Sequence, residues 1–235
     1  MFNPQPQIQP VHIDGEHRAY IIDHALADPH AWVDYAAGHR ERFERSAHNA
    51  FPGPELPMSE PVAQQLEQFF SRHIRSLLGA RRVLRMYSRM ALVTAQPEDL
   101  EPRQWICHRD RFGVPADQCV GASVLYLFDN PALGGTSFYR PRRSAAETDR
   151  LVHDSGVLSG PGFSEKYAIE PGYLSQSNGW FRQVYTVEPR FNRMVFYDGN
   201  LFHCSDIPHP EALSADPRRG RLTINGFFTC RRAAS

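Results

Sequence analysis

The chain has 235 residues, of which 41% are hydrophobic, and its 26 basic side chains balance 26 acidic ones. This balance gives no overall field that would attract nucleic acid or an anionic membrane, so we expect neither as a partner. No apolar stretch approaches the ~20 residues that a membrane span needs, and no secretion signal is recognisable. These features predict a cytoplasmic protein and leave its oligomeric state open.

The pattern changes near residue 83, although we expect residues 1–235 to fold as a single domain with one sizeable core. Residues 1–10 alternate prolines with glutamines, which is typical of a flexible arm. Residues 11–82 have the patterns of one strand and two helices. Residues 83–232 have the patterns of short strands, with an insertion at 141–179.

Two helices are predicted in the N-terminal part. Asp28, which is followed by proline, signals a helix start, and apolar residues at three- and four-residue spacing extend the helix to about Phe43. Ser59 begins a second helix that runs to about Gly79. Because each helix has one apolar face, we expect both to pack as a layer on one side of a sheet. His39 lies on such a face and is predicted to be a packed histidine, not a metal ligand.

Basic residues recur through and beyond the second helix, at Arg72, Arg75, Arg81, Arg82, Arg85 and Arg89. A patch for single-stranded nucleic acid would interleave such charges with aromatic residues on which bases can stack. This run lacks that interleaving. We therefore interpret it as the solvated face of a helix, which agrees with the neutral charge balance of the whole chain.

From residue 83 onward, short segments have the alternation or the continuous apolar character of β-strands: 83–94, 104–108, 122–128, 136–139, 181–187, 193–197, 201–203 and 221–229. Eight strands without helix-strand alternation are typical of a jelly roll, and the one possible helix, around 145–152, lies in the insertion. The predicted fold class is therefore mainly β with α: a double-stranded β-helix core of jelly-roll or cupin type, with the N-terminal helices packed on one sheet. The insertion at 141–179 is long, polar and glycine-rich, which predicts a lid or a substrate loop.

His108 and Asp110 form an H-x-D pair at the end of a candidate strand. Residues i and i+2 of a strand point to the same face, so a distant histidine could complete a three-ligand site, and His203 is the candidate. Two histidines and one carboxylate suit non-haem Fe(II). Cys107 and Cys204 adjoin these residues but would point to the opposite face, so a zinc site of Cys and His ligands is the minor alternative.

Several motifs of this half follow one another in a defined order. The H-x-D pair is followed by Ser123-Val124-Leu125-Tyr126-Leu127-Phe128, Gly134-Gly135-Thr136-Ser137-Phe138, Arg193-Met194-Val195-Phe196-Tyr197, His203 and Arg221-Leu222-Thr223-Ile224-Asn225. Over residues 83–230 this order resembles the Fe(II)/2-oxoglutarate-dependent dioxygenases, in particular their prolyl 4-hydroxylase-like branch. The resemblance implies Fe(II) held by His108, Asp110 and His203, with 2-oxoglutarate and O2 as cosubstrates.

The resemblance also implies a buried cation for the distal carboxylate of 2-oxoglutarate. Arg221 is the candidate, because a guanidinium matches a carboxylate with two parallel hydrogen bonds. Thr223 and Asn225 share its strand face, and Tyr126 matches the tyrosine whose phenol reaches the same carboxylate in the family. Arg219 is the rival cation, but it precedes a glycine in a turn.

This sequence departs from the family pattern at two places. Phe128 stands where the family strand usually ends in Asn, and Arg221 lies 18 positions after His203, which is further than is common in the family. An insertion of loop residues explains that gap. His209 lies within this loop and is the rival distal ligand, although prolines flank it on both sides. Asp110 is retained, whereas halogenating relatives replace it, so the resemblance favours a hydroxylase.

The leading hypothesis is a dioxygenase that hydroxylates a C–H bond of an amino-acid, peptide or small-molecule substrate, with formation of succinate and CO2. Its substrate would enter between the proline-rich loop at 51–57 and the insertion at 141–179. The alternative is a non-catalytic double-stranded β-helix that acts as a metal- or ligand-binding or sensor module. A zinc hydrolase of cupin type is a third reading, but the sequence offers no obvious general base beside the ligands.

Overall fold

The computed structural model describes residues 1–46, 50–110 and 113–233. The helices in this part of the chain are α1 (Pro29–Gly38), α2 (Glu60–His73), α3 (Ala145–Ser155) and α4 (Gly160–Tyr167), with short 3-10 turns η1 (Arg40–Arg42), η2 (Arg75–Leu78), η3 (Pro97–Asp99), η4 (Pro102–Gln104), η5 (Pro131–Leu133) and η6 (Pro210–Ala212). The strands are β1 (Gln9–His12), β2 (Arg18–Ile22), β3 (Glu55–Pro57), β4 (Ala80–Val93), β5 (Gln118–Tyr126), β6 (Thr136–Pro141), β7 (Phe181–Val187), β8 (Arg193–Asp198), β9 (Phe202–Ser205) and β10 (Arg221–Arg232).

The strands form two antiparallel sheets. The larger has the order β1-β2-β8-β5-β10-β4-β3, and the smaller has the order β7-β6-β9. From β4 onward the chain passes repeatedly between them: β5, β8 and β10 return to the large sheet, while β6, β7 and β9 belong to the small one. An isolated bridge from His108 to His203 adds the 105–110 segment to the edge of the small sheet. This alternation is that of a jelly roll and confirms the predicted fold class.

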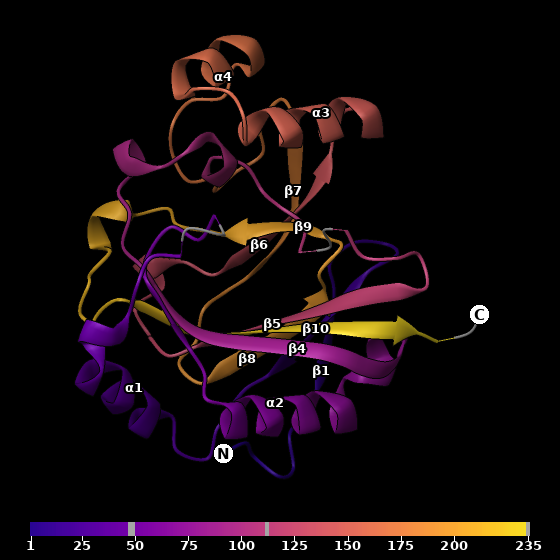
Figure 1. The fold of residues 1–235 in the computed structure, drawn as a ribbon, viewed down its shortest axis with the longest axis vertical. Coiled ribbons are helices and arrows are strands. Elements are labelled where there is room, and N and C mark those ends of the chain that lie inside the picture. The colour runs from indigo at the N-terminus through magenta and orange to yellow at the C-terminus, as the bar shows by residue number, and fades with distance from the viewer. Residues whose placement is uncertain (47–49, 111–112, 234–235) are drawn as a thin grey trace.

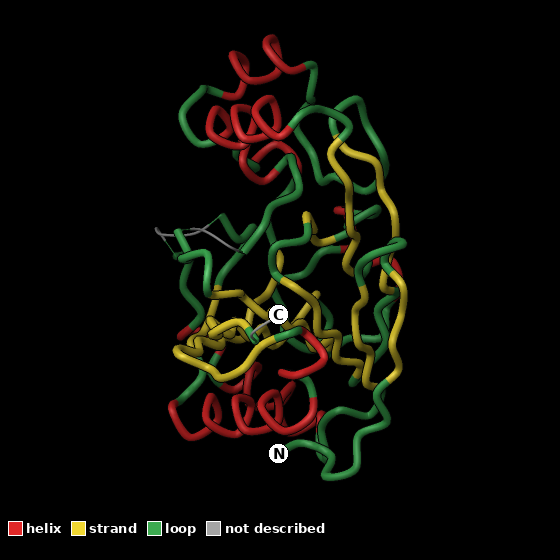
Figure 2. Tube along the Cα trace, turned by 90° about the vertical axis from the view of Figure 1, so that its right-hand side faces the viewer, coloured by secondary structure: helices red, strands yellow, loops and turns green. Residues whose placement is uncertain are grey.

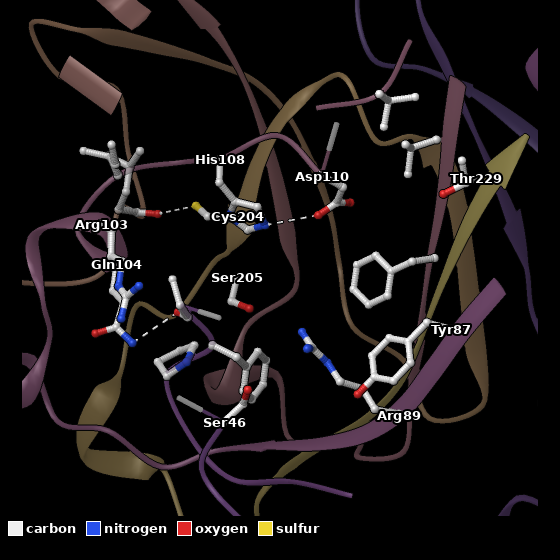
Figure 3. A pocket seen from close by; sticks show the side chains of 18 of the residues that line it. Ser46, Tyr87, Arg89, Arg103, Gln104, His108, Asp110, Cys204, Ser205 and Thr229 are labelled. Carbon is white, nitrogen blue, oxygen red and sulfur yellow. Dashed lines mark hydrogen bonds and ion pairs between the residues drawn. The ribbon is translucent and has the colours of Figure 1, made fainter. Parts of the chain in front are cut away.

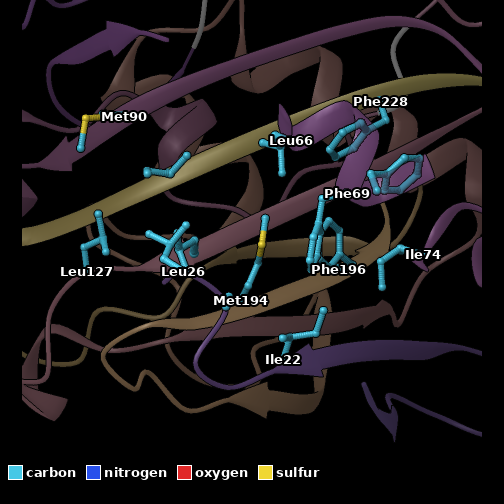
Figure 4. Packing of buried hydrophobic residues seen from close by; sticks show 14 of the residues in the cluster. Ile22, Leu26, Leu66, Phe69, Ile74, Met90, Leu127, Met194, Phe196 and Phe228 are labelled. Carbon is cyan, nitrogen blue, oxygen red and sulfur yellow. The ribbon is translucent and has the colours of Figure 1, made fainter. Parts of the chain in front are cut away.

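α1 and α2 cover one face of the large sheet, and α3 and α4 lie at the opposite end of the molecule (Figures 1 and 2). α2 packs through Leu66, Phe69 and Phe70, which are buried. The ring of Phe70 stacks on that of Phe228 from β10, with 3.9 Å between centroids. Figure 4 shows Phe228 in the same buried cluster as Phe69 of the helix and Phe196 of β8. The expected helical layer on one sheet is therefore present. None of the described helices is long and apolar enough to cross a membrane.

The alternation of β10 separates this core from the interior of the jelly roll. Four of its even-numbered residues belong to the hydrophobic cluster that includes α2: Leu222, Ile224, Phe228 and Cys230. Successive side chains of a strand point to opposite faces, so Arg221, Thr223 and Asn225 face the small sheet. All three are buried. One strand thus carries an apolar face toward the helices and a polar face toward the interior.

Some local predictions differ from the structure. α1 ends at Gly38 and not near Phe43, and the ring of His39 lies at the surface, where it stacks on the exposed Tyr35 with 4.1 Å between centroids. Residues 1–10, predicted as a flexible arm, are attached to the fold: the amide of Asn3 donates to the carbonyl of Ala25 at 2.8 Å, and Gln9 starts β1. β1 lies at the edge of the large sheet, where its Pro10 is tolerated because one side of the strand has no partner strand. The arginines from Arg81 onward lie on β4, not on a helix.

The segment 104–108 is not a strand. Pro102–Gln104 forms a 3-10 turn that is closed by a capping box between Glu101 and Gln104. Within this segment only His108 forms a bridge with another strand residue. The capping box of Glu101 and the proline at position 102 favour a helical turn at the point where the apolar pattern predicted a strand.

The insertion at 141–179 forms a small core of its own. α3 begins with a capping box between Ser144 and Glu147, and α4 follows it directly. Leu151 and Phe163 from the two helices pack in one cluster with Trp105, which lies three residues before His108. The helices of the insertion therefore support the back of the loop that carries the H-x-D pair.

Asp23 provides a test of how β2 is held to β8. Its two carboxylate oxygens accept hydrogen bonds from Nε and Nη2 of Arg193, at 2.6 and 3.0 Å. These bonds keep the pKa of Asp23 below its ordinary value of 3.8. We expect Asp23→Asn to lower the free energy of unfolding by about 1 kcal/mol at pH 7. Because a depressed carboxyl pKa stabilises the fold only while the group is ionised, this difference should shrink as the pH falls below 3.8 in urea unfolding series.

Candidate metal centre

The structure brings His108, Asp110 and His203 together at the edge of the small sheet. Nε2 of His108 lies 3.6 Å from Oδ1 of Asp110, and Nε2 of His203 lies 3.4 Å from Oδ2 of the same carboxylate. One ligand atom from each of the three residues can be chosen so that all lie within 4.8 Å of one another. Donor atoms that share one ion at ~2.1 Å lie at comparable separations, so this cluster can hold a metal ion.

The backbone fixes these side chains in the absence of a regular strand. The amide of His108 donates to the carbonyl of His203 and the amide of His203 donates to that of His108, both at 2.9 Å. The amide of Asp110 donates to the carbonyl of Gly199 at 2.7 Å. A Cβ on Gly199 would lie 3.2 Å from Oδ2 of Asp110, so a larger residue there would have to displace the carboxylate slightly. The backbone of the H-x-D pair is therefore hydrogen-bonded to two segments, at His203 and at Gly199.

The electrostatics of the cluster favour a metal. Nδ1 of His203 lies 2.8 Å from the carbonyl of Leu201, to which it donates, so Nε2 presents its lone pair to the cluster. Burial lowers the pKa of His203 to about 4, which keeps the imidazole neutral. Burial raises the pKa of Asp110, but the two histidines outweigh it and the pKa lies below its ordinary value. Oδ2 of Asp110 is buried and has no hydrogen-bond partner among the described residues, as expected for an atom that binds a cation.

The rival ligands lie elsewhere. Cys107 is fully buried in the cluster under the insertion, and Cys204 packs against that cluster while its thiol donates to the carbonyl of Leu174 at 3.3 Å. Nδ1 of His209 lies 3.0 Å from the carboxylate of Glu211 at the surface. Within the described residues, the one group of at least three possible ligands is the cluster of His108, Asp110 and His203.

Arg221 is a buried cation at the start of β10. Only 2% of the residue is exposed, and Nε donates to the carbonyl of Leu133 at 3.0 Å while Nη2 donates to that of Gly135 at 2.5 Å. No carboxylate of the described residues forms an ion pair with it. Burial accordingly lowers the pKa of Arg221. A buried guanidinium without a carboxylate partner is a site for an anion. Arg219, the rival in the sequence, is exposed.

Two of the other predicted cofactor-binding residues lie near Arg221. Thr223 pairs in register with Tyr126 of β5, so the two side chains are neighbours on the inner face. The phenol of Tyr126 shares a hydrogen bond of 2.7 Å with the hydroxyl of Thr136, and burial raises its pKa to about 12, so it stays protonated. These two hydroxyl groups can donate to an anion beside Arg221. Asn225 lies further along β10, where it pairs in register with Arg89.

The Gly134-Gly135 turn provides the carbonyls that hold Arg221. Gly134 has φ +68°, and a Cβ there would lie 1.6 Å from the carbonyl oxygen of Asp206. A Cβ on Gly135 would lie 1.9 Å from the carbonyl oxygen of Val187. Both glycines are therefore required for the backbone of this turn to fit between the ends of β7 and β9.

We expect Gly134→Ala to destabilise the protein by about 3 kcal/mol or more, because it combines a left-handed backbone with a clash against main-chain atoms. Chemical unfolding monitored by circular dichroism measures this loss. Gly15→Ala is the matched control, since nothing lies within 4 Å of a Cβ at that position. Equal stability of the two variants would contradict the tight packing of the turn.

A family model of unknown function, DUF6445, matches residues 4–228. The chain belongs to DUF6445. No curated protein matches its sequence.

Several solved structures are similar to the DUF6445 chain. A prolyl-4-hydroxylase from Pseudomonas putida is 16% identical, with 93% of this chain and 95% of that chain covered and a TM-score of 0.42. HygX from Streptomyces hygroscopicus, solved with nickel and 2-oxoglutarate bound, is 10% identical, with coverage of 91% and 82% and a TM-score of 0.46. EvdO2 from Micromonospora carbonacea var. aurantiaca is 12% identical, with coverage of 97% and 96% and a TM-score of 0.45. The strand order within the DUF6445 chain, and not these likenesses, identifies its jelly-roll core.

A cavity of about 830 Å³ opens beside the metal cluster. Its lining includes the ligands His108 and Asp110, and Figure 3 shows Tyr87 and Arg89 projecting from β4 into the same space. The proline-rich loop contributes Phe51 and Pro52 to the lining, and the insertion contributes Tyr173 and Leu174. The cavity thus lies between the two segments that we expected to flank the substrate. Its volume is that of a pocket for a small molecule.

Arg85 and Arg89 are residues of this cavity whose basic run we interpreted as a solvated helix face, although 83–94 was itself predicted as a strand. Both lie on β4 and line the cavity, and the side chain of Arg89 is only 11% exposed. The signal that could have found them is the alternation of 83–94, which places Arg85, Tyr87 and Arg89 on one face of a strand.

Proposed function

We propose that the DUF6445 chain is a non-haem Fe(II)- and 2-oxoglutarate-dependent dioxygenase that hydroxylates a C–H bond of an amino-acid, peptide or small-molecule substrate. The observation that carries the proposal is the cluster of His108, Asp110 and His203, two imidazole nitrogen donors and one carboxylate at the mouth of a cavity. This ligand set suits Fe(II) and leaves other coordination positions open. With 2-oxoglutarate and O2, Fe(II) would couple decarboxylation to succinate and CO2 with transfer of one oxygen atom to the substrate.

The chain's own residues prepare this reaction. The carbonyl of Leu201 holds His203 in the tautomer that presents Nε2 to the metal. Arg221 offers its guanidinium to the distal carboxylate of 2-oxoglutarate, because the described carboxylates, Asp206 included, do not form an ion pair with it. Thr223 and the phenol of Tyr126 lie beside it as hydroxyl groups for the same carboxylate.

The zinc hydrolase reading lacks support from the cavity. Hydrolysis by a metal-bound water needs a general base within hydrogen-bond reach. Among the described residues that line the cavity, Asp110 is the one carboxylate, and it belongs to the metal cluster. A dioxygenase needs no such base, because the substrate C–H bond is oxidised and not attacked by water.

Formation of succinate tests the proposal without knowledge of the substrate. Protein purified without oxygen and supplied with Fe(II), 2-oxoglutarate and O2 should form succinate slowly by uncoupled turnover, and a chelator should stop it. Calorimetry should detect binding of 2-oxoglutarate only in the presence of a divalent metal. Absence of metal binding, of 2-oxoglutarate binding and of succinate together would reject the dioxygenase.

A further inference from the structure

The walls of the cavity combine aromatic surface with positive charge. Its lining includes the rings of Phe51, Tyr87, Tyr173 and Phe227 and the side chains of Arg85, Arg89 and Arg103. Asp110 is the one carboxylate of the described lining, and it faces the metal cluster; Arg89 and Arg103 form ion pairs with Glu55 and Glu101, which lie outside the lining. Such a cavity fits an anionic molecule with an apolar body better than a cationic or a neutral polar one.

Arg89 is the most enclosed of these arginines. Its guanidinium lies between two rings, 5.3 Å from the centroid of Phe51 and 5.1 Å from that of Phe227. Nη1 forms an ion pair of 2.7 Å with the carboxylate of Glu55, a residue that is 5% exposed and lies outside the cavity lining. The two rings and Glu55 hold the guanidinium in one orientation. The side chain of Arg89 would therefore lose little conformational entropy when a ligand binds.

The opposite edge of this guanidinium is unused. The interactions of Arg89 with other described side chains engage Nη1 and the faces of the ion, while Nε is buried and has no hydrogen-bond partner. Nε and Nη2 are the pair of nitrogens whose N–H bonds run parallel and match the two oxygens of a carboxylate. An unsatisfied buried donor on a cavity-lining side chain indicates a ligand that offers an acceptor oxygen.

We propose that Arg89 binds the carboxylate of the prime substrate, and that the substrate is a small-molecule carboxylic acid with an apolar, ring-sized body. This inference rests on the proposed dioxygenase function and names its substrate class. Arg221 does not line the cavity and serves the cosubstrate, so the two arginines bind different carboxylates. A substrate held at Arg89 lies along the aromatic wall with its far end toward His108 and Asp110.

A comparison of an acid with its amide tests the assignment. Phenylacetate and phenylacetamide have the same shape, and only the acid carries the negative charge. Each is titrated by calorimetry into protein saturated with Mn(II) and 2-oxoglutarate, so that the Arg221 site is already filled. We expect phenylacetate to bind at least about tenfold more tightly than the amide, as one charge-assisted bidentate contact allows. Equal binding of the two compounds, or binding of neither, would overturn the proposal.

Variants of Arg89 assign the preference to this residue. Arg89→Gln should bind the acid and the amide equally, and Arg89→Lys, which keeps the charge but loses the fork, should keep part of the preference. Arg82→Gln is the matched control, because Arg82 is an exposed arginine on the same strand outside the cavity lining. An Arg89→Gln protein that folds and prefers the acid as the wild type does would overturn the proposal. If the glutamine variant does not fold, loss of the preference in Arg89→Lys supports it and an unchanged preference overturns it.

The same titrations in metal-free protein separate this inference from the proposed function. Arg89 needs neither the metal nor 2-oxoglutarate to bind an acid. Protein that binds no metal but prefers the acid through Arg89 would reject the dioxygenase and keep the carboxylate site. Protein that forms succinate but shows no preference for the acid would reject the carboxylate site alone.

Discussion

Replacing His108 with alanine should abolish metal binding while the fold survives. The side chain is 56% exposed, so its removal leaves no cavity in the core and little change in the free energy of unfolding is expected. It contributes one of three donors to the metal, and changes even to groups that only support a ligand cost 10–100-fold in metal affinity. We therefore expect His108→Ala to lower the affinity for Fe(II) by ~100-fold or more. Succinate formation should fall to background, measured beside anaerobic metal titration.

His209→Ala provides the matched control for this prediction. His209 is also an exposed histidine, it rivals His203 in the sequence, and it pairs with Glu211 away from the metal cluster. The control should retain wild-type metal affinity and succinate formation. A His108→Ala protein that still forms succinate would contradict the assignment of the ligands. If wild-type protein binds metal but forms no succinate, the non-catalytic binding or sensor module becomes the better description.

Periodicity of strands predicted the parts of the site that lie on regular structure. The alternation in β10 predicted that Arg221, Thr223 and Asn225 share one face, and the structure places all three on the buried inner face. His203 was predicted on a strand and lies in β9. In these cases the physical rule is local: a strand of period two fixes which side chains are neighbours.

The remaining parts depend on contacts between distant segments. Asp110 lies beside the histidines because its amide bonds to Gly199, which no property of the H-x-D sequence specifies. Gly134 was identified as part of a motif, but its necessity comes from the approach of Asp206, which lies 72 residues further along the chain. Close approach of this kind is a property of the packed fold and not of a local pattern.

Arg89 illustrates how a composition argument fails. An arginine in a basic run is usually solvated, and that general expectation concealed the alternation of its own strand. In the fold the aliphatic and planar parts of its side chain lie against Phe51 and Phe227, and Glu55 balances its charge. The burial of such an arginine requires partners from β3 and β10, and the sequence of β4 alone contains neither.

Arg221→Gln should abolish tight binding of 2-oxoglutarate and leave metal binding intact. Two charge-assisted hydrogen bonds to one carboxylate contribute enough that their loss should weaken binding by roughly 100-fold. In the wild type, 2-oxoglutarate at 100 times its dissociation constant should raise the free energy of unfolding by ~2.7 kcal/mol, and this stabilisation should vanish in the variant. The free protein should lose little stability, because removal of an unpaired buried charge offsets the lost bonds to the Gly135 turn.

Arg219→Gln is the matched control for Arg221, since it removes an exposed guanidinium two residues away on the same chain segment. It should bind 2-oxoglutarate as the wild type does. Arg221→Lys should bind with intermediate affinity, because it keeps the charge but not the fork that matches a carboxylate. If Arg221→Gln binds 2-oxoglutarate normally and Arg89→Gln does not, the cosubstrate occupies the aromatic cavity, and the roles given to the two arginines must be exchanged. A thermal unfolding series with and without 2-oxoglutarate on these variants distinguishes the two arrangements.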